Sequence, residues 1–112
     1  MDVEVRYVEG CANLPVIRRR LACALDAIGR ADVDVRLRQI HTDAEAAEIG
    51  FSGSPTILLN GLDPFPATNA VVGLTCRLYR SADGFGVPTV EQLTAALRRA
   101  DGIEVLDDGP AD

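Results

Sequence analysis

The sequence predicts a single α/β domain, and three observations support this class. Segments with the two-residue hydrophobic alternation of strands occur between segments with the three- and four-residue spacing of helices. The length of 112 residues suits one domain around one core. The composition, 47% hydrophobic and 25% charged, is that of an ordinary globular protein. We therefore expect strands and helices that alternate along the chain.

Hydrophobic periodicity predicts the first strand, the first helix and the second strand. Residues 3–8 alternate apolar and charged side chains, and residues 33–38 do the same with a charged outer face that suits a sheet edge. Residues 14–28 between them form a helix that ends at Gly29, with Asn13 and Pro15 at its start. The apolar stripe of this helix consists of Leu14, Ile17, Leu21, Leu25 and Ile28.

A capping box predicts a second, shorter helix. Thr42 is followed three residues later by Glu45, the spacing at which the two side chains cap each other's backbone N–H groups. The helix should cover residues 44–49 and end at Gly50. The nearly continuous apolar run at residues 55–59 then predicts a central strand that is covered on both faces.

The second half of the chain predicts a turn, a long loop, a strand and a helix. The turn is Asn60-Gly61, and the loop covers residues 62–73. Residues 74–79 alternate as a fourth strand. Thr89 and Gln92 form a second capping box that opens the last helix, whose buried stripe consists of Leu93, Ala96, Leu97 and Ala100. The predicted order is βαβαββα, with a four-stranded mixed sheet flanked by helices.

The domain boundary and the cellular setting follow from composition. Residues 1–101 form the expected domain, and the acidic residues 102–112 form an expected disordered tail. The net charge of −6, with no lysine and no tryptophan, argues against nucleic acid as a partner. No apolar run is long enough for a membrane span, and the first residues do not resemble a secretion signal, so we expect a cytoplasmic protein without a membrane partner.

The three cysteines predict reactive or free thiols. An odd number at irregular spacing in a reducing compartment argues against a disulfide framework. With no C-x-x-C motif and one histidine, we expect no metal site and no cofactor. Cys11 lies between the first strand and the first helix, where helix N–H groups favour a thiolate, although the alternative is a buried structural side chain. Cys23 lies opposite the apolar stripe and is expected to be incidental.

The segment Gly53-Ser54-Pro55-Thr56, with a cysteine after the first strand, resembles the thioredoxin superfamily over residues 2–100. In that superfamily the loop carries a cis-proline, and the backbone before the proline lies beside the active thiol. The resemblance implies that Cys11 is the attacking cysteine. It also implies that Ser54-Pro55 is the edge that binds an extended substrate. Leu14 occupies the place of the resolving cysteine, which excludes an exchange cycle within one C-x-x-C pair.

A second resemblance involves the segment 74–79, which contains Cys76, and the later sequence Val87-Pro88-Thr89. These segments are similar to the end of organomercurial (alkylmercury) lyases and of short bacterial thioredoxin-like proteins that share their catalytic half. The resemblance implies that Cys11 and Cys76 are the two mercury-binding thiols, because mercury is a soft metal. The proton-donating acid of the lyases would fall at Leu14, which cannot donate a proton.

The sequence leaves three functions open. The first is a thioredoxin-fold protein with one reactive thiol, Cys11, that exchanges with a thiol or disulfide substrate or binds a soft metal. The second is a non-catalytic binding module of the same fold, whose partner contacts the loop at residues 62–73. The third is lyase-like cleavage of a C–Hg bond by Cys11 and Cys76. The oligomeric state is left open.

Overall fold

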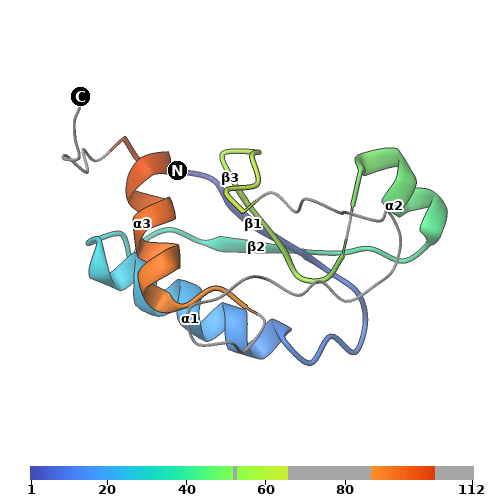
Figure 1. The fold of residues 1–112 in the computed structure, drawn as a ribbon, viewed down its shortest axis with the longest axis horizontal. Helices are drawn as coiled ribbons and strands as arrows, with labels where there is room; N and C mark the ends of the chain where they lie inside the picture. The colour runs from blue at the N-terminus through green and yellow to red at the C-terminus, as the bar shows by residue number, and fades with distance from the viewer. Residues whose placement is uncertain (52, 66–86, 103–112) are drawn as a thin grey trace.

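The computed structural model describes residues 1–51, 53–65 and 87–102, which form a mixed α/β fold (Figure 1). The expected fourth strand at residues 74–79, most of the expected loop at 62–73 and the segment 103–112 lie outside these residues. The elements in chain order are β1 (Val3–Tyr7), α1 (Leu14–Ala27), β2 (Val35–Gln39), α2 (Asp43–Ile49), β3 (Thr56–Leu59) and α3 (Val90–Ala100).

The described sheet has three strands in the order β2-β1-β3. β2 runs parallel to β1, and β3 runs antiparallel to it, so the sheet is mixed as expected. β2 begins at Val35, two residues later than predicted, because Val35 is the partner of Val3, the first residue of β1. Val33 instead donates its N–H to the carbonyl of Arg30 at 3.1 Å and packs against the core.

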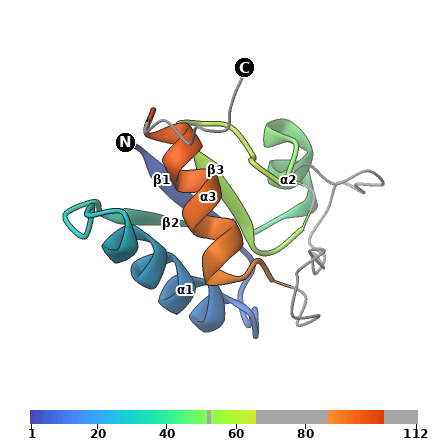
Figure 2. The ribbon, with the colours of Figure 1, turned by 60° about the vertical axis from the view of Figure 1, so that its left-hand side comes forward.

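The main core lies between one face of the sheet and the helices α1 and α3, which pack against each other (Figure 2). The central members of the apolar stripes predicted for both helices are buried, because they meet the alternate side chains of β1 and β3. The end members Leu14, Ile28 and Ala100 are partly buried. The buried members from the strands are Val3, Val5, Ile57 and Leu59. Those from the helices are Ile17, Leu21, Ala24, Leu25, Leu93, Ala96 and Leu97.

A smaller hydrophobic cluster lies at the α2 end of the sheet and contains Ile40, Ala46 and Phe51. One of the two predicted capping hydrogen bonds of α2 is present, since the Thr42 side chain accepts the N–H of Glu45 at 3.0 Å. The second, from the N–H of Thr42 to the Glu45 side chain, is replaced by another. The Glu45 carboxylate accepts the N–H of His41, one residue before the cap, at 2.9 Å.

The other face of β1 carries charge, and the charges are paired. Glu4 is only 8% exposed, and its carboxylate accepts hydrogen bonds from Arg6 at 3.0 Å and from Arg36 at 3.2 Å. Arg36 also binds Asp2 at 2.7 Å, and this hydrogen bond raises the pKa of Arg36 above its ordinary value.

Leu37 on β2 is 38% exposed, which agrees with the edge position predicted for this strand within the described sheet.

Polar contacts fix both ends of α3. At its start, Thr89 and Gln92 form the predicted capping box, with bonds of 3.0 and 2.9 Å. Before its start, the guanidinium of Arg20 donates to the carbonyl of Pro88 at 2.9 Å. At its end, Asp101 accepts two hydrogen bonds from Arg30, at 2.7 and 2.8 Å. The chain is therefore anchored up to the predicted domain boundary.

Candidate functional site

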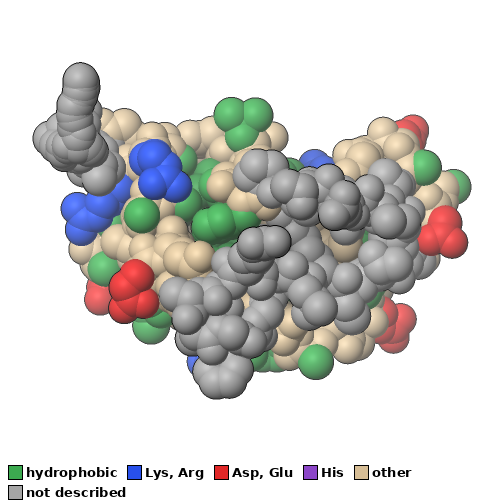
Figure 3. All heavy atoms as spheres, in the orientation of Figure 1, with side chains coloured by type: hydrophobic (Ala, Val, Ile, Leu, Met, Phe, Trp, Pro, Cys, Tyr) green, Lys and Arg blue, Asp and Glu red, His purple; other side chains and the backbone are tan. Residues whose placement is uncertain are grey.

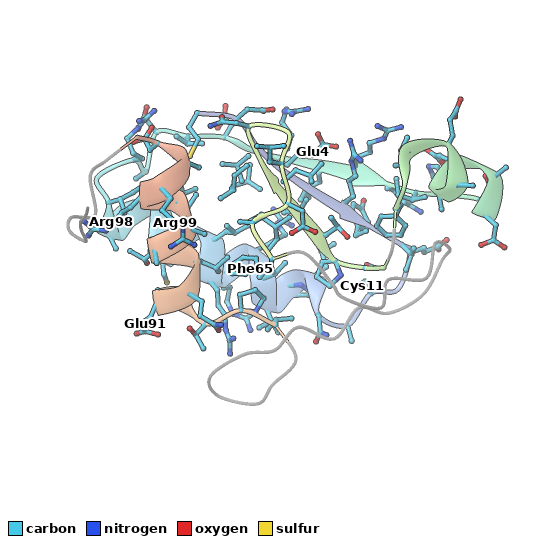
Figure 4. All side chains as sticks on the ribbon, turned by 45° about the horizontal axis from the view of Figure 1, so that its top comes forward. Glu4, Cys11, Phe65, Glu91, Arg98 and Arg99 are labelled. Atoms are coloured by element: carbon cyan, nitrogen blue, oxygen red, sulfur yellow. The ribbon has the colours of Figure 1, made fainter. Side chains whose placement is uncertain are left out.

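Cys11 lies in the turn that joins β1 to α1 (Figure 4). Gly10 before it has a φ of +78°, a backbone conformation that suits glycine, and this turns the chain out of the strand. The N–H of Cys11 donates to the carbonyl of Val8 at 3.2 Å, and its carbonyl accepts the N–H of Leu14 at 3.2 Å. The thiol-bearing residue is thus held on both sides, and it is partly exposed.

The start of α1 supplies few donors to a thiolate. Asn13 is the cap residue, but its side chain makes no capping bond. The N–H of Leu14 is already bound to the carbonyl of Cys11, and Pro15 has no N–H. Cys11 therefore lies two residues before the cap rather than inside the first helical turn, which weakens the predicted effect of the helix terminus.

The predicted proline loop lies beside this turn. The peptide bond between Ser54 and Pro55 is cis, as the resemblance implied. The Ser54 hydroxyl oxygen accepts the N–H of Val8 at 3.1 Å, while the carbonyl of Val8 accepts the N–H of Cys11. Val8 thereby connects the loop to the cysteine turn through its own two backbone groups. Within the loop, the Thr56 hydroxyl donates to the carbonyl of Gly53.

Burial limits what this loop offers to a substrate. Ser54 is 1% exposed, and Pro55 is fully buried. The Ser54 hydroxyl is used inside the protein, since it accepts a backbone N–H. Ser54 could therefore reach a substrate only through its backbone, which is the contact that the resemblance implied.

Of the other two cysteines, the structure describes one. Cys23 is exposed on α1, as predicted for a residue opposite the apolar stripe. Cys76 lies outside the described residues. Within residues 1–51, 53–65 and 87–102, no three His, Cys, Asp or Glu side chains are grouped so that they could hold a metal ion. Leu14, in the place of a resolving thiol, is partly buried against the core.

A pocket of about 430 Å³, which was not predicted from the sequence, lies beside the C-terminal half of α3. It is lined by Leu59, Asn60, Leu62, Asp63, Pro64, Ala96, Arg99 and Ala100. The Asn60-Gly61 turn was a signal for part of it. The other wall comes from α3, some 35 residues later in the chain. Hydrophobic periodicity predicts local structure and does not predict contacts between segments so far apart.

Comparison with known proteins gives no family. No protein-family model, no curated protein and no solved structure matches the chain. Among the described helices, none is long and apolar enough to cross a membrane.

Proposed function

We propose that this protein has a thioredoxin-like fold and acts through one reactive thiol, that of Cys11. The observation that carries the proposal is the link through Val8, which holds the Ser54-Pro55 loop beside the turn that contains a partly exposed cysteine. The element order also supports it, because the described strands and helices match six of the seven expected elements in sequence. The seventh expected element, at residues 74–79, lies outside the described residues.

The proposed chemistry is thiol–disulfide exchange. The Cys11 thiolate attacks one sulfur of a disulfide, an S–S bond forms between Cys11 and that sulfur, and the other sulfur leaves as a thiolate. Leu14 cannot complete the cycle, so a second thiol must attack the mixed disulfide and release Cys11. A low-molecular-weight thiol is the co-reactant that we assign to this step. The same thiolate would also bind a soft metal.

Competition between cysteines tests the proposal, because Cys23 is exposed whereas Cys11 is only partly exposed. If exposure alone governed the rate, Cys23 would react first. We expect Cys11 to be alkylated faster than Cys23 by limiting iodoacetamide at pH 7, as measured by mass spectrometry of the native protein. Cys23→Ser should retain the fast phase and Cys11→Ser should lose it. A fast phase that survives Cys11→Ser would reject the proposal.

The second candidate is a non-catalytic binding module, and the burial of Ser54 and Pro55 favours it. A loop whose hydroxyl and ring are both inside the protein can serve packing alone. This function predicts that Cys11→Ser changes neither the thermal midpoint nor partner capture. It also predicts that Cys11 reacts no faster than Cys23 in the alkylation experiment, so one measurement separates the two candidates.

A further inference from the structure

The pocket beside α3 lies at the far end of β1 from Cys11. Its floor includes Leu59, which pairs with Val3 at the start of β1, whereas Cys11 follows the end of that strand. In Figure 3 apolar side chains are visible between α3 and the turn after β3, with basic side chains on the α3 side. The pocket is therefore a separate site, and nothing in the proposed thiol chemistry uses it.

Polar contacts fix the turn that forms one wall of this pocket. Asn60 and Gly61 both have positive φ values, 53° and 82°, and Leu59 and Leu62 exchange two backbone hydrogen bonds across them. The Asn60 side chain donates to the carbonyl of Ala100 at 3.0 Å, and it accepts the N–H of Asp2 at 2.9 Å. One asparagine thus ties the turn to α3 and to the start of β1, so the position of the turn relative to α3 is fixed.

The described lining is mostly apolar and includes the cation Arg99. Leu62 is 73% exposed, which leaves a large apolar side chain in contact with water. Arg99 is exposed, and its guanidinium forms no hydrogen bond or ion pair with any residue that the structure describes. Figure 4 shows Arg99 on the side of α3 nearer to Phe65, and Arg98 on the other side. The lining also contains an acid, Asp63, which already accepts the N–H of Phe65 at 2.8 Å.

We infer that this pocket binds a small monocarboxylate with an apolar chain, such as a medium-chain fatty acid. The chain would cover Leu59 and Leu62 and remove apolar surface from water. The carboxylate would pair with Arg99, whose planar guanidinium suits a carboxylate better than an ammonium group does. The volume of about 430 Å³ lies in the range of small-molecule pockets, ~300–1,000 Å³.

A titration of the full-length protein with three eight-carbon probes tests this inference. Sodium octanoate, octan-1-ol and octylammonium chloride are compared by two-dimensional NMR at fixed salt and pH 7. We expect octanoate to bind most tightly, with a Kd on the order of 1 mM for so few atoms. Octylammonium should bind most weakly. The perturbed amides should cluster at residues 59–63 and 96–100.

Two arginines in the last turn of α3 provide a matched pair. Arg99 lines the pocket and Arg98 does not, although both are basic residues of the last helical turn. Arg99→Gln should weaken octanoate binding by up to about fivefold, the range for an exposed ion pair, and leave octanol binding unchanged. Arg98→Gln should change neither.

Several results would overturn the inference. These are equal affinity for the three probes, an equal loss in Arg98→Gln, and amide shifts that fall elsewhere in the protein. A further one concerns Leu62→Ser: if this variant lowers the sedimentation coefficient, the pocket belongs to an interface between two copies of the chain. None of these results bears on Cys11, so the thiol proposal is judged separately.

Discussion

Among single residues, Glu45 could be predicted as part of a helix cap, but the hydrogen-bond partner of its carboxylate could not. Its spacing from Thr42 correctly predicts a capped helix start. The partner of its carboxylate, the N–H of His41, depends on the path of the chain between β2 and α2, which the spacing does not contain. The same carboxylate lies 3.5 Å from Arg38 on β2. Glu45 therefore joins a strand to the helix that follows it.

These contacts predict a pH dependence of stability. The hydrogen bond from His41 is the main cause that lowers the pKa of Glu45, with Arg38 adding to it. A lowered pKa in the folded state means that the charged carboxylate stabilises the fold above its ordinary pKa of 4.5, and that this contribution is lost as the pH falls further. Urea unfolding should show Glu45→Gln less stable than wild type at pH 7, with the difference shrinking towards pH 3.

Glu48→Gln is the control for this titration. Glu48 lies on the same helix and is exposed, and its side chain forms no hydrogen bond or ion pair with the residues that the structure describes. The Glu48→Gln protein should follow the wild type at every pH. A Glu45→Gln deficit that stays constant between pH 7 and pH 3 would contradict the assigned role of the charge.

Among elements, an ion pair joins the ends of α1 and α3. Nη1 of Arg30, just after α1, donates to both carboxylate oxygens of Asp101, whose side chain is 14% exposed. Charge-assisted hydrogen bonds of this kind are stronger than hydrogen bonds between neutral groups. We expect Asp101→Asn to lower the free energy of unfolding by about 1–2 kcal/mol, measured by urea denaturation.

Asp32 is the matched control, because it approaches the same arginine at 3.6 Å with a side chain that is 77% exposed. Asp32→Asn should cost less than about 0.5 kcal/mol, as is usual for a surface position. Equal losses in the two variants would mean that the contact between Arg30 and Asp101 has no special role.

The elements themselves could largely be predicted from the sequence. Short-range spacing predicts the buried apolar stripes of α1 and α3, the α3 capping box and the Asn60-Gly61 turn. The structure confirms each of these features. The start of β2 could not be predicted, because it is set by the register with β1 and not by the alternation of its own residues. The same limit applies to the site. Cys11 could be selected from the sequence, but its link to Ser54 through Val8 depends on tertiary packing.

At the scale of the whole molecule, the apolar interior is divided. The larger cluster joins the sheet to α1 and α3, and the smaller one, around Phe51, lies under α2. Few of the described residues support the smaller cluster, and its helix has only seven residues. A region with few buried contacts can open without global unfolding. We therefore expect α2 to open more readily than the α1–α3 layer.

Hydrogen exchange in a pair of conservative variants measures this difference. Phe51→Leu should cost under ~1.5 kcal/mol and should speed exchange of the α2 amides by up to about tenfold. The amides of Leu21 in α1 and Leu97 in α3 should change less, because their cluster stays intact in the local opening. Leu93→Met, in the larger cluster, should instead speed exchange at Leu21 and Leu97, since those amides are exposed only when that cluster opens. If Phe51→Leu speeds all amides equally, the two clusters unfold as one unit and the division has no energetic meaning.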